Sequence, residues 1–161
     1  MFGEMINLIV ACGHNRVIGK KGRLPWSIEE DWDYFLKTTA GGTMIMGKTC
    51  YEEFEPYIEE REIIALTRDN SFRFANAKTA HSLNQALSQA SMPTIWICGG
   101  SSLYKESMPI ANRLYITKIN HSFDGDVFFP PWEKIFTQMI SRKKVNTEKF
   151  DLEFMIFEKN A

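Results

Sequence analysis

Asn15-Arg-Val-Ile-Gly-Lys-Lys-Gly-Arg-Leu-Pro-Trp26, with Asp31 five positions further on, is the stretch that decides how this chain folds. It predicts a glycine-containing loop that leads directly into a helix. In that helix Asp31 lies three residues after Ile28 and four before Phe35, so the three side chains share one face. A carboxylate on an apolar face needs a cation or a fork of hydrogen-bond donors. The alternative is an ordinary acid in the first helical turn, where the helix dipole favours it.

Length and composition restrict the class of protein. The chain has 161 residues, enough for a sizeable core, and we expect residues 1–161 to form one domain. The net charge of −1 gives no global field that would attract nucleic acid or a membrane, and no apolar run is long enough to span a bilayer. The three cysteines form no C-x-x-C motif, which favours reduced thiols in a cytosolic protein. The three histidines lack metal-ligand spacing, so no metal is expected.

Apolar runs and glycines predict alternating strands and helices. We expect strands over residues 5–11, 43–46, 63–67, 94–98, 114–119, 135–145 and 152–158. We expect helices over residues 27–38, 48–54, 82–90 and 101–107. Ser27 with Glu30 forms a capping-box pattern, and Ser82 is placed to cap the third helix. This order indicates an α/β domain with a mainly parallel sheet and an antiparallel C-terminal edge.

Two strands run straight into glycine and then a helix, at Gly47 and at Gly99-Gly100. Glycine lets the backbone approach a ligand, and the first N–H groups of a helix attract phosphate. The alternative is a pair of tight strand–helix turns, since neither site is a G-x-G-x-x-G motif. Lys48 and Arg68 would suit an additional phosphate, such as the 2′-phosphate of NADPH, or they are ordinary surface cations. With no recognisable hydrolytic triad or metal motif, the pattern favours proton-coupled redox chemistry or simple binding.

Taken together, the motifs resemble dihydrofolate reductase over nearly the whole chain. Each is weak alone, but their order and spacing are specific. The segments that carry the resemblance are Asn15–Gly19, Leu24–Trp26 with Asp31, Met46–Lys48, Arg61, Leu66–Arg68, Gly99–Tyr104, Leu114–Thr117, and Asp124–Asp126 before Phe129-Pro130. The resemblance implies an eight-stranded, mainly parallel sheet with an antiparallel C-terminal edge strand and four flanking helices. It also implies NADPH as hydride donor, 7,8-dihydrofolate as substrate, binding of antifolate inhibitors, and a cytoplasmic monomer.

The same resemblance assigns residues to roles. Those implied for catalysis are Asp31, which would bind the pterin, Trp26, Thr117 and Tyr104. Those implied for the substrate are Ile9, Val10, Asp31, Phe35, Phe54, Ile58, Arg61, Cys98 and Thr117, with Arg61 on the glutamate α-carboxylate. Those implied for the cofactor are Ala11, Ile18, Gly19, Gly47, Lys48, Thr49, Cys50, Leu66, Thr67, Arg68, Gly99, Gly100, Ser101, Ser102, Leu103 and Tyr104. The Gly99–Gly100 peptide would be cis, and residues 13–26 would form a mobile lid.

Three features depart from the family pattern. Cys50 stands where a threonine is usual, and Cys98 stands where a larger apolar residue is usual. Glutamates crowd the sequence around Arg61; they are Glu55, Glu59, Glu60 and Glu62. Either they form an acidic pocket mouth, or they point away from the pocket as the solvated end of a helix.

Two other functions fit parts of the pattern. A riboflavin-pathway reductase of the same fold would not need Leu24-Pro25-Trp26 together with Asp31. A non-catalytic protein that binds folate or nucleotide would not need both Asp31 and the glycine pair.

Overall fold

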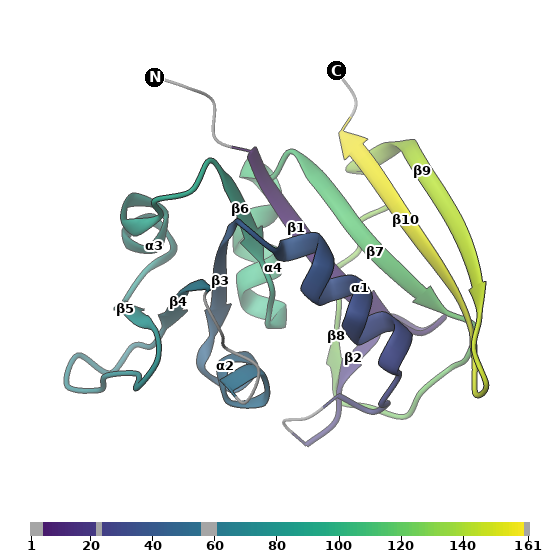
Figure 1. Ribbon diagram of the computed structural model, residues 1–161, viewed down its shortest axis with the longest axis horizontal. Helices are drawn as coiled ribbons and strands as arrows, with labels where there is room; N and C mark the ends of the chain where they lie inside the picture. The colour runs from purple at the N-terminus through teal and green to yellow at the C-terminus, as the bar shows by residue number, and fades with distance from the viewer. Residues whose placement is uncertain (1–4, 22–23, 56–60, 160–161) are drawn as a thin grey trace.

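An eight-stranded sheet forms the centre of the computed structural model, which describes residues 5–21, 24–55 and 61–159 (Figure 1). Its strand order is β5-β4-β3-β6-β1-β7-β10-β9. The strands are β1 (Met5–Cys12), β3 (Thr43–Gly47), β4 (Glu62–Leu66), β5 (Lys78–Ala80), β6 (Thr94–Ile97), β7 (Arg113–Ile119), β9 (Phe136–Asn146) and β10 (Asp151–Lys159). From β5 to β7 all pairings are parallel, whereas β10 is antiparallel to β7 and to β9. This architecture confirms the α/β fold class expected from the sequence.

Helices cover both faces of the sheet. They are α1 (Glu29–Thr39), α2 (Lys48–Phe54), α3 (Leu83–Gln89) and α4 (Ser101–Ser107), followed by the short η2 (Met108–Ile110). Alternate residues of the central strands point to opposite faces: Ile9 packs with α1 and α2, whereas Leu8 and Val10 pack with α3 and α4. Figure 1 shows α1 in front of the sheet and α4 behind it. The helices change face where the chain turns back from β5 to β6, as right-handed crossovers require.

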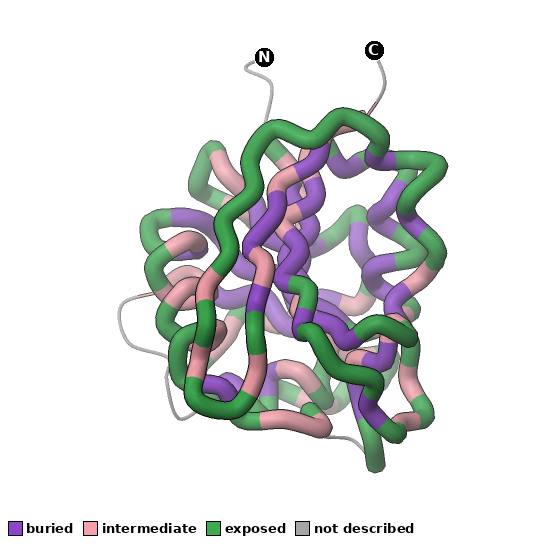
Figure 2. The backbone as a smooth tube through the Cα atoms, turned by 90° about the vertical axis from the view of Figure 1, so that its right-hand side faces the viewer, coloured by how far each residue is buried: buried purple, intermediate pink, exposed green. Residues whose placement is uncertain are grey.

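The C-terminal hairpin closes one side of the sheet. Residues of β9 are exposed along most of the strand, whereas those of β10 are mainly buried or half-buried, as Figure 2 shows from that side. The register of the pair shifts at Ile156/Phe157, where Ser141 and Met139 are successive partners. Such a bulge twists an edge strand and limits pairing with other chains. Within the described part of the chain, no helix has the length and apolar character needed to cross a membrane.

Several local expectations were wrong or incomplete. Helix α1 begins at Glu29 with Ile28 as its N-cap, and no side chain caps it, so the predicted Ser27 capping box does not form. Ser82 does cap α3, because its side chain accepts a hydrogen bond from the Gln85 N–H at 3.0 Å. Three short strands were missed: β5, and the pair β2 (Val17–Gly19) and β8 (Val127–Phe128), which form a separate two-stranded sheet.

Candidate active site

A cavity of about 710 Å³ opens at the carboxyl ends of β1, β6 and β7, between α1, α2 and α4. This is where an open parallel sheet places its ligands. Most of the predicted site residues line it: Ile9, Val10, Ala11, Ile18, Gly19, Asp31, Phe35, Thr49, Cys50, Phe54, Cys98, Gly99, Gly100, Ser101, Ser102, Tyr104 and Thr117. Ile58, another expected wall residue, lies outside the described residues, as do Glu59 and Glu60 of the expected acidic mouth.

Asp31 is the acid of this cavity. It is half-buried in the first turn of α1, and its helix face carries buried Ile28 and half-buried Phe35, as the spacing predicted. Burial raises the pKa of Asp31 to about 6, and a hydrogen bond from the Thr117 side chain opposes that rise. Thr117 comes from the carboxyl half of β7 and is itself buried. The structure therefore presents a desolvated carboxyl group to the cavity, with one threonine to orient it.

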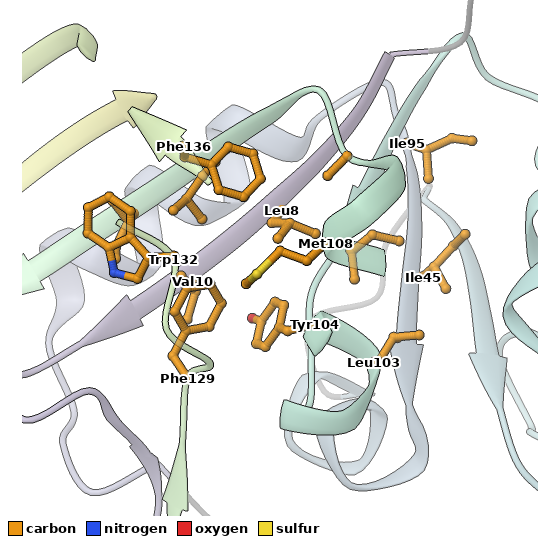
Figure 3. Close-up of a cluster of buried hydrophobic side chains, with 14 of the residues drawn as sticks. Leu8, Val10, Ile45, Ile95, Leu103, Tyr104, Met108, Phe129, Trp132 and Phe136 are labelled. Atoms are coloured by element: carbon orange, nitrogen blue, oxygen red, sulfur yellow. The ribbon is translucent and has the colours of Figure 1, made fainter. Parts of the chain in front are cut away.

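Tyr104 forms part of the cavity wall through its ring. Its hydroxyl donates a hydrogen bond to the Ile9 carbonyl oxygen at 2.6 Å, and its ring meets Phe129 at a centroid distance of 5.0 Å. Figure 3 shows this ring inside the cluster of buried side chains between β1 and α4. Burial raises the pKa of Tyr104 well above its ordinary value. The hydroxyl thus stays protonated and fixes the ring against β1.

The Gly99–Gly100 peptide bond is cis, as the resemblance implied. Gly99 has a φ of +118°, and a Cβ added there would lie 3.3 Å from the Tyr104 ring. The Gly47 N–H donates to the Gly99 carbonyl at 2.7 Å, which joins the ends of β3 and β6. A Cβ on Gly100 would meet nothing within 4 Å. The backbone at Gly100 is therefore open to a ligand.

The loop after β1 is held against residues 120–129 and reaches the cavity through Ile18 and Gly19. Lys20 forms an exposed ion pair with Asp124 at 2.7 Å. The Asp126 side chain accepts from the Lys21 N–H at 3.3 Å, and the Asp126 N–H donates to the Gly19 carbonyl at 3.0 Å. These contacts connect the predicted lid to a segment more than 100 residues away.

Trp26 does not line the main cavity. It lines a neighbouring one of about 670 Å³ and packs against Phe123, with ring centroids 4.8 Å apart. Leu103 also does not line the main cavity, because its side chain is buried in the core between α4 and the sheet.

Five of the predicted cofactor residues lie outside the cavity, on the side of β3 and β4. These are Gly47, Lys48, Leu66, Thr67 and Arg68. Both cations are exposed, and the Lys48 ammonium lies 4.4 Å from the centroid of the Phe72 ring. His81, which directly follows β5, lies beside these residues, with its Nδ1 2.9 Å from the Thr67 carbonyl oxygen. These five predicted cofactor residues can contact a ligand only if that ligand extends along the sheet beyond the main cavity.

Arg61 lies near the C-terminal end of α1. Its guanidinium donates to the Leu36 carbonyl at 2.6 Å and to the Thr39 hydroxyl at 2.7 Å. A longer contact reaches the Met44 sulfur at 3.6 Å. Of the two interpretations of the glutamates around Arg61, Glu62 contradicts the acidic mouth, because its carboxylate turns to Lys78 and Ser91, away from the cavity.

Glu62 instead belongs to a polar cluster at the opposite end of the sheet. Its carboxylate accepts from the Lys78 ammonium at 3.0 Å, from the Ser91 N–H at 2.8 Å and from the Thr43 hydroxyl. Although burial acts to raise the pKa of Glu62, these hydrogen bonds lower it to about 2. The cluster ties β4 to β3 and to the segment before β6.

The two cysteines of the cavity are adjacent and free. The Cys50 thiol donates to the Cys98 carbonyl at 3.3 Å. Burial raises the pKa of Cys50 to about 12 and that of Cys98 well above its ordinary value. Both are therefore protonated thiols that act as small apolar wall residues.

Sequence reasoning also missed several other residues of the cavity wall, which are Leu24, Trp32, Tyr34, Glu53, Lys105 and Val127. Trp32 and Glu53 were detectable in principle, since each adjoins a predicted site residue on its helix. Trp32 stacks on Phe35 at 5.4 Å and contacts Phe54 at 5.6 Å, which joins α1 to α2.

Comparisons with known proteins agree on one family. A family model described as dihydrofolate reductase matches residues 5–159. Dihydrofolate reductases of Staphylococcus haemolyticus and Bacillus subtilis strain 168 are each 35% identical to the chain, over 96% of its length and 95% of theirs. The structure of the Enterococcus faecalis dihydrofolate reductase, complexed with NADP(H) and RAB-propyl, superposes with a TM-score of 0.89 at 26% identity and 99% coverage of both chains.

Proposed function

The chain belongs to the dihydrofolate reductase family, and we propose that it reduces 7,8-dihydrofolate to 5,6,7,8-tetrahydrofolate with NADPH in the cavity at the carboxyl ends of its strands. The observation that carries this proposal is Asp31. A desolvated carboxyl group with a raised pKa, at the wall of an apolar cavity, is characteristic of a site that binds and polarises a proton-accepting heterocycle.

Asp31 binds the pterin in this proposal. Its two oxygens accept hydrogen bonds from the 2-amino group and the neighbouring ring nitrogen, a bidentate geometry that supports the anion. Before the ligand arrives, the hydrogen bond that supports the carboxylate comes from Thr117. Ligand donors therefore convert a poorly solvated carboxylate into a paired one, and this conversion favours binding.

The same carboxylate promotes protonation of the substrate. A negative charge close to the ring system in a water-poor cavity raises the proton affinity of the bound pterin, including that of N5. The proton reaches N5 from water. Tyr104 contributes through its ring, because its hydroxyl is already donated to Ile9.

The residues present fit NADPH. Gly47 and Gly100 are the N-caps of α2 and α4, and neither helix has a side-chain cap, so their first N–H groups remain for other acceptors. The space beside Gly100 lets the cofactor approach the backbone. We assign Lys48 and Arg68 to the 2′-phosphate. When bound, NADPH supplies the hydride.

A spectrophotometric experiment tests the function. Loss of the NADPH absorbance band should require dihydrofolate, and it should be far slower with NADH. A riboflavin-pathway reductase would instead consume NADPH with a pyrimidine substrate, and a binding protein would consume none. Persistence of the band with dihydrofolate at neutral pH would contradict the proposal.

We extend the proposal to the state of the protein in the cell. Residues 1–161 act as one domain, and the protein works as a cytoplasmic monomer that also binds antifolate inhibitors. Three free cysteines, two of them in the candidate site, support a reducing compartment. A mass measurement in solution tests the oligomeric state.

A further inference from the structure

The cleft of this protein forks at Asp31. The main cavity of about 710 Å³ and the second cavity of about 670 Å³ share five lining residues: Leu24, Asp31, Trp32, Thr49 and Glu53. The second cavity is therefore an extension of the site that holds the pterin. Its remaining walls are Trp26, Ser27, Ile28, Glu29 and Glu52.

The two arms differ in position and in charge. Arg61, the cation assigned to the substrate carboxylate, contacts Leu36 and Thr39 at the end of α1. Glu29 stands at the other end of that helix, about 15 Å away at the usual rise per residue. An anionic tail that reaches Arg61 does not enter the second cavity.

The lining of the second cavity selects a different kind of substituent. Trp26 and Trp32 supply aromatic surface, which binds flat rings and attracts cations. Glu29 and Glu52 add negative charge around that surface, and among the described residues that line the cavity none is lysine, arginine or histidine. Asp31, a desolvated carboxyl group, faces the same space. An aromatic group with a protonated amine matches both features.

We propose that the second cavity is a ligand subsite for a cationic, aromatic-linked substituent on a molecule whose heterocycle is held by Asp31. The inference rests on the proposed function for the position of the heterocycle. The cavity and its tryptophans define the site, and the carboxylates determine the charge that it accepts. Because the glutamates are exposed, the preference is modest and sensitive to salt.

The test uses two inhibitors that differ only in charge. Both are 5-benzyl-2,4-diaminopyrimidines, one with a propyl and one with a 3-aminopropyl group on the phenyl ring. Binding is measured by tryptophan fluorescence, which needs no turnover. We expect the amine to bind roughly two- to tenfold more tightly at low salt, and the preference to shrink toward unity near 1 M salt, where the Debye length is about 3 Å.

Matched double variants separate the subsite from general charge. Glu29→Gln with Glu52→Gln should weaken the preference and leave the affinity of the propyl compound unchanged. Glu30→Gln with Glu55→Gln removes one glutamate of α1 and the glutamate that directly follows α2. Both positions line neither cavity, so this double variant should retain the preference.

Three results would overturn the subsite: equal affinities in the unmodified protein, a preference that the first double variant does not reduce, or failure of both compounds to bind. Dihydrofolate turnover in the same samples reports on the proposed function separately. An active enzyme without the preference would reject only the subsite.

Discussion

Replacement of Asp31 by Asn should make the ligand-free protein more stable while it removes most of the activity. The folded state binds the Asp31 proton more tightly than the unfolded state, because its pKa rises from 3.8 to about 6. Between these values the folded state binds more protons, so the stability of the unmodified protein falls as pH rises through that window. Above about pH 6 the full penalty is present. The variant carries no such penalty.

The magnitude follows from the same shift. A rise from 3.8 to about 6 corresponds to about 3 kcal/mol if the folded state keeps the whole effect. Two terms reduce it. Asp31 is only half-buried, and its charge also interacts favourably with the start of α1, by about 0.3–1 kcal/mol. We therefore expect Asp31→Asn to increase the free energy of unfolding by about 1–2 kcal/mol at pH 7–8 and to change it little near pH 4.

Urea unfolding of both proteins at several pH values gives the answer. Asp33→Asn, an exposed change on the same helix, is the control and should produce no comparable pH-dependent gain. Turnover of Asp31→Asn should fall by about 10²–10⁴-fold at neutral pH and partly recover in acid, where the substrate arrives protonated. If Asp31→Asn lowered stability at pH 8, or raised it equally at pH 4 and pH 8, the carboxyl group would not be desolvated as described.

Three further changes test other parts of the site and the fold. Removing the charges of Lys48 and Arg68 together should raise the NADPH KM by about 5- to 150-fold, an effect of about 1–3 kcal/mol, with little change in the NADH KM. Equal changes in the two KM values would show that these two cations do not bind the 2′-phosphate. Cys50 should react slowly with a maleimide, because burial raises its pKa to about 12, and NADPH with a folate analogue should slow the reaction further, as mass spectrometry of the labelled peptide would show. Glu62→Gln should lower the free energy of unfolding by about 1–3 kcal/mol at pH 7. The difference between the two proteins should disappear as pH falls from about 4.5 toward about 2, because the ionised Glu62 carboxylate, whose pKa is lowered in the fold, contributes its full stabilisation only above that window.

The sequence predicted the central elements well because their signals are strong and local. Apolar runs that end in glycine located β3 and β6, and the alternation of apolar and polar residues located the β9–β10 hairpin. The strands that were missed are two or three residues long. Strand β2 exists only because it pairs with β8, more than 100 residues later, and so short a segment carries no usable periodicity.

A site residue could be predicted where its position in the sequence indicated that its side chain needs a partner. Asp31 is such a residue, because a carboxyl group between two apolar positions of a helix face needs a partner that the helix does not supply. The acidic run around Arg61 gave no such indication, because successive residues of an extended chain point in opposite directions. Arg61 turns toward α1, whereas Glu62, the next residue, turns to Lys78 and Ser91.

The placement of charge along α1 links these observations to specificity. The first turn of the helix carries Glu29, Glu30 and Asp31, whereas Arg61 adds a cation close to its last turn. Each end thus opposes the partial charge of the helix dipole, which accounts for the pattern without any ligand. Asp31 departs from this purely structural role because its carboxyl group is desolvated, and desolvation works against the dipole benefit. A fold that needed only a helix start would leave that acid in water, as it does with Glu29 and Glu30. The position of Asp31 therefore supports the ligand-binding role that we propose for it.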